Sequence, residues 1–594
     1  MQLSLLDWGV LALYGLTVIS LGLICVRKAG VNTEEYFLAG RSMPWWLLGT
    51  SMVATTFSSD TPNLVSDLVR TGGVSQNWIW WAFVITGMCT VFFYAKLWRR
   101  SEVLTDIGFY ELRYSGRKAA FLRGFRAIYL GVFFNVMIMA SVTLSAIKLG
   151  EVLLGIDKYT IVLIAGTATL IYSSTSGLRG ILMTDLLLFG ISMVGSVLAA
   201  FYALQIPEVG GLSGLMANPL VADKISFLPD FSNPSEAIAI LIVPIAVQWW
   251  STWYPGAEPG GGGYSAQRML AAKDEANALQ AALWFNVAHY ALRPWPWILV
   301  ALASLVIYPT IEDLAIAFPN VDETVLGHDM AYPAMLTFVP HGLLGLVVAS
   351  LMAAYMSTIS THLNWGASYL VDDVYRRFYC PNREEKHYVK VGRFSTLGLM
   401  LISSIVALQL QSAMQAFQIL LQIGAGTGLV FLLRWFWWRI NSWTEIAAMT
   451  ISFFTALYFG FAHTQLGFKA WSPSTTLVVS VAITTAGWLA VALLTKPEDI
   501  ETLRNFYQKI RPLGSGWNPV LEDSEKETFG AHENSELTAS LLSWFLGCVL
   551  IYSCIFGTGF LIYGHRTTGL ICILIAGLSA WRILKLLPRI GLLR

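Results

Sequence analysis

The chain has 594 residues and a formal net charge of +1; 55% of it is hydrophobic and only 13% is charged. A soluble protein carries roughly 25% charged residues, so this composition excludes an ordinary soluble domain and indicates a polytopic membrane protein. The six cysteines are scattered and show no Cys-x-x-Cys or metal-ligand spacing. Neither a disulfide framework nor a zinc site is therefore expected.

The apolar segments are long enough to cross a bilayer. The first, residues 5–26, lacks a basic leader and a small-residue cleavage site, so we expect a retained span rather than a signal peptide. At about 20 residues per span, the chain is predicted to contain roughly 15 helices. They lie near 5–26, 44–71, 76–97, 122–150, 158–175, 180–205, 236–257, 278–308, 335–371, 388–410, 413–435, 443–463, 475–495, 540–563 and 566–588.

The basic residues predict how the chain is oriented. Lysine and arginine concentrate in alternate short loops, for example 96–126 and 376–393, and are sparse in the others. By the positive-inside rule, we expect the N-terminus outside and the C-terminus in the cytoplasm, in the plasma (inner) membrane.

One span is predicted to be broken in its middle. Residues 49–63 read Gly-Thr-Ser-Met-Val-Ala-Thr-Thr-Phe-Ser-Ser-Asp-Thr-Pro-Asn inside an otherwise apolar segment. Pro62 removes a backbone donor and biases Thr61 away from helix. A broken helix is tolerated in lipid only where it lines a cavity, and its freed carbonyls can hold a hard cation. The alternative is a proline-kinked helix whose hydroxyls bond their own backbone.

A second break follows in the span that begins at 236. Residues 255–263 read Pro-Gly-Ala-Glu-Pro-Gly-Gly-Gly-Gly, which cannot form a stable membrane helix. Broken helices in corresponding positions of two halves are the best sequence indication of a transport site. Five spans start at each break, and an odd-membered repeat must be inverted. The alternative is a glycine-rich loop at the membrane surface.

The predicted organisation follows from these two breaks. It comprises an N-terminal helix and loop (1–43), a first inverted repeat (44–205), an external loop (206–235), a second inverted repeat (236–440), additional helices (441–495), a cytoplasmic loop (496–536) and a C-terminal helix pair (537–594).

The ninth span carries a polar face. Ala354, Ser357, Thr358 and Thr361 are spaced to share one side of a helix. A few neutral oxygens suit a weakly held monovalent ion better than a divalent one. A small-residue packing seam, with hydroxyls bonded one turn back, is the alternative explanation.

Several ordered motifs resemble the sodium:solute symporter family over roughly the first thirteen spans. They are Glu35-Tyr-Phe-Leu-Ala-Gly-Arg41, Gly177-Leu-Arg179 with Thr184-Asp185, Gln267-Arg268 through Lys273, Ala354-x-x-Ser357-Thr358, and Asp372-Asp373-Val-Tyr375. The resemblance implies an all-α, LeuT-type fold of two inverted five-helix repeats, with one extra N-terminal helix and about four extra C-terminal helices.

The resemblance also implies a coupling ion. Sodium would be held by the carbonyls of Ala54, Phe57 and Ala354 and the hydroxyls of Ser357 and Thr358. Asp185 would assist sodium release toward the cytoplasm, and Tyr264 is similar in position to an aromatic inner gate. The segment after the first break, Ser58-Ser-Asp60-Thr61-Pro62-Asn63, differs from the corresponding sequence of sugar-carrying members. The resemblance therefore assigns the coupling ion and leaves the solute open.

The two breaks supply the candidate substrate-binding residues: Thr56, Asp60, Thr61, Asn63, Gln248, Trp250, Trp253 and Glu258. Aromatic faces beside carboxylates and amides suit either a sugar or an amine. Asp60 is equally compatible with a substrate partner, a sodium-site neighbour or a helix cap. Arg293, in the eighth span, could pair with Asp60 or Glu258, or bind a substrate carboxylate.

The predicted function is sodium-coupled symport of a small polar organic solute (a sugar, amino acid, amine or carboxylate) by alternating access in the lipid bilayer. An enzyme is not expected, because no nucleophile–base pair, His pair or phosphate loop is present. Nor is a nucleic-acid partner expected. His289, His362 and His387 fit packing roles better than ligand roles. A transporter-like sensor, or a proton-coupled carrier on the same fold, remains an alternative.

Overall fold

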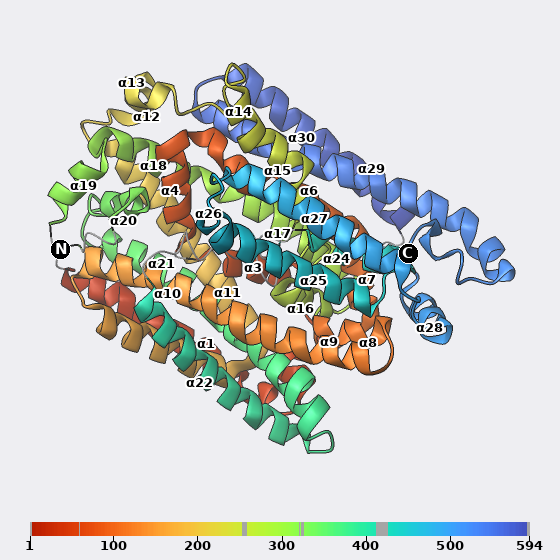
Figure 1. The fold of residues 1–594 in the computed structure, drawn as a ribbon. Helices are drawn as coiled ribbons and strands as arrows, with labels where there is room; N and C mark the ends of the chain where they lie inside the picture. The colour runs from red at the N-terminus through yellow and green to blue at the C-terminus, as the bar shows by residue number, and fades with distance from the viewer. Residues whose placement is uncertain are drawn as a thin grey trace.

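The computed structural model describes residues 3–58, 60–251, 258–319, 321, 326–410, 424 and 426–590. This part of the chain folds into a helical bundle whose termini lie at opposite ends (Figure 1). Its β-type pairing is limited to an isolated bridge between Met43 and Ala272. Ten helices within it are long and apolar enough to cross a membrane, so the chain is a multi-pass membrane protein.

The first half of the chain contains eleven main helices and two short ones in the following loop. They are α1 (Leu5–Ala29), α2 (Thr33–Leu38), α3 (Trp45–Thr56), α4 (Thr61–Gly72), α5 (Trp78–Trp81), α6 (Val84–Cys89), α7 (Ala95–Ser101), α8 (Phe109–Arg113), α9 (Gly116–Ile128), α10 (Asn135–Leu154), α11 (Lys158–Gln205), α12 (Gly211–Ala217) and α13 (Pro219–Ala222).

The second half continues with α14 (Pro234–Ala237), α15 (Val243–Ala246), α16 (Gly263–Leu270), α17 (Glu275–Asn286), α18 (Pro294–Ile307), α19 (Ile311–Ala317), α20 (Ala331–Leu336), α21 (Leu343–Ser368), α22 (Glu385–Gln409) and α24 (Gly428–Phe436). The C-terminal part adds α25 (Ser442–Leu457), α26 (His463–Gln465), α27 (Pro473–Leu494), α28 (Ile500–Ile510), α29 (Asp523–Ile562) and α30 (Arg566–Leu586).

Short π-helical segments join several of these helices into single spans. They include η3 (Thr90–Tyr94), η5 (Tyr129–Phe134), η8 (Val287–Leu292) and η11 (Tyr369–Tyr379). Such segments are frequent at functional sites because the extra residue per turn releases a backbone group. The segment η8 matters most here, because it leads directly into Arg293 and α18.

The helix α11 contains two of the predicted spans without a loop between them. Its helical backbone is interrupted at Gly177, whose φ is 58°. A Cβ at this position would stand 3.0 Å from the Ala29 Cβ and from the Tyr36 carbonyl oxygen. Glycine is therefore needed both for the backbone conformation and for the close approach of neighbouring segments.

The predicted first break is present. The helix α3 ends at Thr56, Phe57 leaves helical geometry (φ −90°, ψ 68°), and α4 begins at Thr61 with Pro62 in its first turn. The hydroxyls of Thr55 and Thr56 also bond carbonyls one turn back, at 2.8 Å to Ser51 and 3.0 Å to Val53. Back-bonding and a true interruption therefore coexist.

The second break lies between Gln248–Trp250 and α16, with residues 252–257 outside the described part. The glycine-rich turn that precedes α16 is buried among other segments of the chain. Gly260 and Gly261 have φ values of 84° and 90°. The Trp98 indole donates to the Gly260 carbonyl at 2.8 Å, and an added Cβ on Gly260 would stand 2.9 Å from the Tyr94 ring.

The C-terminal pair α29–α30 runs along one edge of the bundle (Figure 1). The helix α29 begins at Asp523, inside the range predicted as a cytoplasmic loop. Three indole or phenol groups join it to the core: Trp544 donates to the Ile85 carbonyl (2.8 Å), Tyr552 to the Trp81 carbonyl (3.0 Å), and Trp295 of α18 to the Ile555 carbonyl (3.2 Å).

Two glycines with nearly equal φ angles, Gly260 (84°) and Gly467 (85°), allow a test of how tightly the turn is packed. Gly260→Ala should lower thermal stability by about 1–3 kcal/mol more than Gly467→Ala, because an overpacked methyl adds to the positive-φ strain. Gly467 has a φ of 85° but nothing within 4 Å of an added Cβ. Melting of the purified protein in detergent measures the difference. Equal losses in the two variants would contradict tight packing around Gly260.

Candidate functional site

Four helices meet at a buried polar junction, defined here as Ser51, Asp185, Arg268, Ser357 and Thr361. Asp185, on α11, accepts hydrogen bonds from the Ser51 hydroxyl of α3 (2.5 Å) and the Ser357 hydroxyl of α21 (2.7 Å). All five side chains are at most 1% exposed. The carboxylate therefore ties α3 and α21 to α11 at one point.

Arg268, on α16, completes this junction. Its guanidinium donates to the Thr361 hydroxyl at 2.7 Å and to the Ser51 hydroxyl at 3.2 Å, and it stands 4.0 Å from the Asp185 carboxylate. A buried charge is tolerated only with a nearby counter-charge and hydrogen bonds. The two charges lie 4.0 Å apart and share the Ser51 hydroxyl, which donates to Asp185 and accepts from Arg268.

The predicted sodium residues lie where α21 packs against the last turn of α3. Ala54, Phe57, Ala354, Ser357 and Thr358 are each 1–2% exposed. The Thr358 hydroxyl donates to the Thr55 carbonyl at 2.8 Å and to the Ala354 carbonyl at 3.1 Å. The Ala54 carbonyl accepts the Phe57 N–H at 3.1 Å. A cation at this contact would use these carbonyl and hydroxyl oxygens in place of some of the present hydrogen bonds.

Asp185 was predicted from the resemblance as a release residue, and it touches one of the predicted ligands. Its hydrogen bond from Ser357 places the carboxylate beside the α3–α21 contact. Neutral oxygens with one nearby carboxylate match a singly charged hard cation better than a divalent one.

The first break brings Thr56 together with two residues of the eighth span. The Thr56 carbonyl accepts from Arg293 at 2.6 Å, and its hydroxyl lies 3.0 Å from the His289 ring nitrogen Nδ1. Asp60 accepts from the Ser58 hydroxyl. The Thr61 hydroxyl donates to the Thr56 carbonyl at 3.3 Å. Side chains of the eighth span and of Thr61 therefore supply hydrogen-bond partners for Thr56 at the end of α3.

Asn63 faces a different helix. Its amide nitrogen donates to the Ser145 hydroxyl of α10 at 3.2 Å, and its buried carbonyl oxygen has no partner among the described residues. An unpartnered buried acceptor costs free energy unless a ligand or water supplies a donor.

Among the residues that the structure describes, the predicted substrate-binding residues of the second break contact other segments and not the predicted substrate-binding residues of the first break. Gln248 donates to the Ile79 carbonyl at 2.7 Å, and the Trp250 indole to the Ala246 carbonyl at 3.1 Å. Glu258 is 5% exposed and pairs with Arg126 of α9 at 2.9 Å. Trp253 lies outside the described residues. Tyr264, on α16, is buried with its ring centroid 5.9 Å from that of His362.

Glu258 belongs to a charged cluster beside the glycine-rich turn. Asp106, in the loop before α8, accepts from the Gly263 N–H at 2.7 Å and from the Tyr369 hydroxyl at 2.5 Å. Burial, reinforced by the neighbouring Glu258 carboxylate, raises the pKa of Asp106 to about 6. The cluster holds α9, η11 and the turn together.

A second ion-pair network closes the same end of the bundle. Arg123 of α9 contacts Glu111 (2.7 Å), Asp372 (2.8 Å) and Asp373 (2.6 Å). Hydrogen bonds from Arg377 and Arg123 hold the pKa of Glu111 below its usual value against the effect of partial burial. The Asp372-Asp373 motif therefore serves to lock η11 onto α8 and α9.

Sequence reasoning missed some of the central residues. Ser51 and Ser145 gave no signal, because isolated serines are common in membrane helices. His289 was interpreted as a packing residue, but it bridges Thr56 and Arg293. Arg268 was noted only as part of a motif. A charged residue within a broken membrane helix was the signal that could have singled it out.

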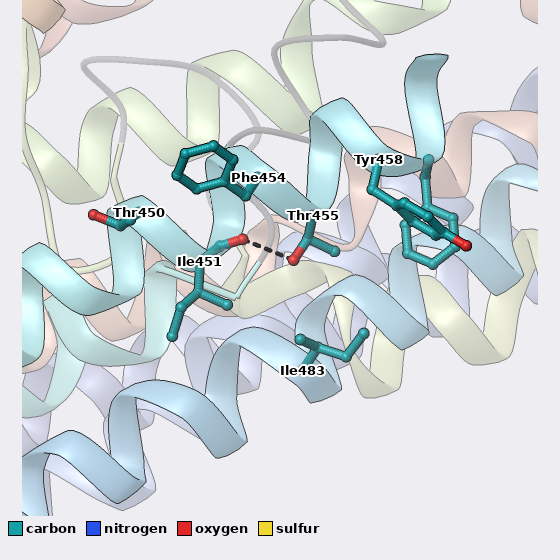
Figure 2. Close-up of a pocket in the computed structure, with 7 residues that line it drawn as sticks. Thr450, Ile451, Phe454, Thr455, Tyr458 and Ile483 are labelled. Atoms are coloured by element: carbon teal, nitrogen blue, oxygen red, sulfur yellow. Dashed lines mark hydrogen bonds between the residues drawn. The ribbon is translucent and has the colours of Figure 1, made fainter. Parts of the chain in front are cut away.

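A surface pocket of about 410 Å³ lies elsewhere, between α25 and α27 (Figure 2). It is lined by Thr450, Ile451, Phe454, Thr455, Tyr458, Phe459 and Ile483. The Thr455 hydroxyl is already bonded to the Ile451 carbonyl at 2.7 Å. This apolar pocket contains none of the predicted site residues and no charge, so it does not match a polar solute.

Comparison with known proteins agrees with this architecture. The model of the family described as "Sodium:solute symporter family" matches residues 36–452. A sodium/glucose cotransporter of Vibrio parahaemolyticus is 28% identical over 503 residues, which are 81% of this chain and 90% of that protein. Sodium/glucose cotransporter 1 of Oryctolagus cuniculus is 26% identical and covers 73% of this chain and 69% of its own.

A solved structure shares the fold. A Na⁺-coupled sialic acid symporter in a substrate-bound outward-open state aligns with a TM-score of 0.68 and 19% identity, over 84% of this chain and 99% of that one. Its similarity confirms the predicted all-helical, LeuT-type architecture.

The two interrupted helices around a buried polar junction define a membrane transporter rather than an enzyme. Because the family model spans most of its length, the chain belongs to the sodium:solute symporter family.

A double-mutant cycle tests the charge balance at the junction. Asp185→Asn leaves Arg268 buried without its counter-charge and should cost about 3–5 kcal/mol, whereas Asp185→Asn combined with Arg268→Gln should cost much less than the sum of the single changes. Melting in sodium-free buffer measures this coupling without any contribution from ion binding. Additive losses would show that the two charges do not depend on each other.

Proposed function

We propose that this symporter imports a small polar organic solute by alternating access, driven by a sodium ion bound between the first broken helix and α21. The ligands are the carbonyls of Ala54, Phe57 and Ala354 and the hydroxyls of Ser357 and Thr358. The observation that carries the proposal is the contact of the Thr358 hydroxyl with the last turn of α3, at 2.8 Å from the Thr55 carbonyl. This contact holds the two ligand-bearing helices face to face.

The chemistry of this site favours sodium. Backbone carbonyls and hydroxyls are hard, uncharged ligands, and the Asp185 carboxylate supplies one negative charge beside them. Because Arg268 already offsets part of that charge, binding of the ion stays weak enough to be reversible. Reversible binding is what a coupling ion requires.

The same arrangement suggests a release step. When the inward-facing state separates α3 from α21, the sodium site loses its two halves. Arg268 can then take over the Asp185 carboxylate, so the departing ion leaves no unpaired charge in the membrane. Moving one charge through 100 mV contributes about 2.3 kcal/mol to each cycle.

The solute is proposed to bind at the first break. Thr56, Asp60, Thr61 and Asn63 offer hydroxyl, carboxylate and amide groups there. The relatives named above carry glucose, and the fold neighbour binds sialic acid, which supports a small polar solute. Tyr264 is proposed as the inner gate. Gln248, Trp250 and Trp253 remain predicted solute-binding residues.

Sodium binding can be tested with a matched pair of variants. Thr358→Val removes the oxygen at constant shape and should weaken sodium affinity at least tenfold, or about 1.4 kcal/mol, whereas Thr358→Ser should keep it. Ser357→Ala with Thr358→Ala should abolish binding. Binding of radioactive sodium to the purified protein measures affinity, and sodium-free melting corrects for the lost Thr55 contact.

Unchanged sodium affinity in the double variant would refute this site. Solute uptake that is driven by a proton gradient and not by a sodium gradient would favour the proton-coupled alternative.

We also propose that the N-terminus is external and the C-terminus cytoplasmic, in the plasma (inner) membrane. Ser232 is exposed in the loop predicted to be external (206–235), and Glu384 is exposed in the basic loop predicted to be cytoplasmic (376–393). Ser232→Cys should react with a membrane-impermeant thiol reagent in intact cells, and Glu384→Cys only after permeabilisation. The parent chain, with its own cysteines, gives the background. The reverse pattern of labelling would invert the topology.

A further inference from the structure

Arg293 is a buried cation in the middle of the eighth span. It joins η8 to α18, within the span Glu275–Ile307, and is 2% exposed. Its guanidinium donates to the Thr56 carbonyl at 2.6 Å, which places it directly at the first break. A charge at this depth is costly and indicates a functional site with a specific partner.

The described contacts of Arg293 are with neutral groups. Nε donates to the His289 carbonyl (3.1 Å), Nη1 contacts the carbonyl and hydroxyl of Thr56, and Nη2 lies 3.1 Å from the His289 ring. The charge also lies near the rings of Trp297 (5.3 Å) and Phe57 (6.0 Å). These contacts use at most four of the five N–H groups.

Neither acid that the sequence offered as a partner neutralises Arg293. Glu258 pairs with Arg126 instead, at 2.9 Å. Asp60 is close enough for electrostatic attraction, but its carboxylate accepts from the Ser58 hydroxyl. No carboxylate of the described residues lies within 4.0 Å of the guanidinium. At least one N–H of the guanidinium therefore has no acceptor among the residues that the structure describes.

We infer that the transported solute carries a carboxylate, and that this group binds Arg293. The inference rests on the proposed symport and identifies its substrate class. Guanidinium and carboxylate form short, charge-assisted and often bidentate hydrogen bonds. A solute carboxylate would supply the counter-charge that no described residue supplies within 4.0 Å. Thr56 and His289 would fix the orientation of the guanidinium. A neutral sugar would leave the charge uncompensated.

Asp60 favours a zwitterion among carboxylate-bearing solutes. It lies on the other side of the break from Thr56, and its carboxylate accepts from the Ser58 hydroxyl, whereas Arg293 donates to Thr56. An ammonium or quaternary amine beside Asp60 and a carboxylate beside Arg293 would satisfy both charges at once. A doubly charged anion would be repelled by Asp60.

The first test compares matched probes on the wild-type protein. Melting temperature is measured in sodium chloride and in potassium chloride with L-proline, L-alanine, glycine betaine, the amides L-prolinamide and L-alaninamide, the anions L-lactate and pyruvate, and D-glucose and myo-inositol. At least one carboxylate probe should raise the melting temperature in sodium by about 3 °C or more, and its amide or a sugar should not. Zwitterions should act more strongly than plain anions.

The second test uses variants. Arg293→Gln should abolish the shift caused by the active carboxylate while keeping the shift caused by sodium alone. Arg293→Lys keeps the charge but loses the planar guanidinium that donates two parallel hydrogen bonds, so the melting-temperature shift caused by the carboxylate should be smaller but still present. The control is Arg70→Gln. Arg70, in the last turn of α4, is also buried, but it donates to the Ser304 hydroxyl and the Tyr308 carbonyl at the C-terminal end of α18. The shifts caused by sodium and by the carboxylate should therefore both survive in this variant.

The outcomes separate the two proposals. Equal shifts from an acid and its amide, a response to sugars alone, or failure of every carboxylate probe overturns the carboxylate assignment. Survival of the carboxylate response in Arg293→Gln overturns the role of Arg293. Absence of any sodium-dependent shift in the wild-type protein instead refutes the proposed sodium coupling. Should Arg293→Gln fail to fold, the acid–amide comparison on the wild type still decides.

Discussion

The structure depends on one buried charge balance, between Asp185 of α11 and Arg268 of α16. Neither side chain reaches solvent; the two lie 4.0 Å apart and are bridged by the Ser51 hydroxyl, while Arg268 also donates to Thr361. A much larger gap would leave both buried charges without a counter-charge. The intermediate distance leaves the carboxylate free to serve α3 and α21 through Ser51 and Ser357. Four helices therefore converge on a single ionised group.

The helix breaks make that convergence possible. In lipid, an interrupted helix needs polar partners for its freed backbone groups, and here side chains from distant segments supply them. Arg293 satisfies the Thr56 carbonyl, and Trp98 satisfies the Gly260 carbonyl. The breaks are therefore stable features of the fold rather than weak points. The first break also brings a cation, a carboxylate and several hydroxyls into one buried region, in which we have proposed that the solute binds.

The sequence predicted the class, the two breaks and the face of α21 because each leaves a one-dimensional pattern: apolar length, proline with glycine, and helical spacing. It could not predict partners that are far apart in the chain. Glu258 was grouped with the first break because both interrupt a helix, but the turn Gly260–Gly263 carries it toward Arg126. For Arg293, likewise, only the three-dimensional arrangement could show that Glu258 pairs with Arg126 instead. Trp253 lies outside the described residues, and its role stays a prediction.

The C-terminal helix α29 has a mechanical consequence. Through Trp544 and Tyr552 it is bonded to backbone carbonyls at Ile85 and Trp81, and it receives the Trp295 indole from α18. Trp295 stands two residues from Arg293 in the chain. The α5–α6 region and α18 are therefore clamped to one common strut, which favours their movement as a single rigid body. A displacement of α18 relative to the α5–α6 region would have to break these three hydrogen bonds.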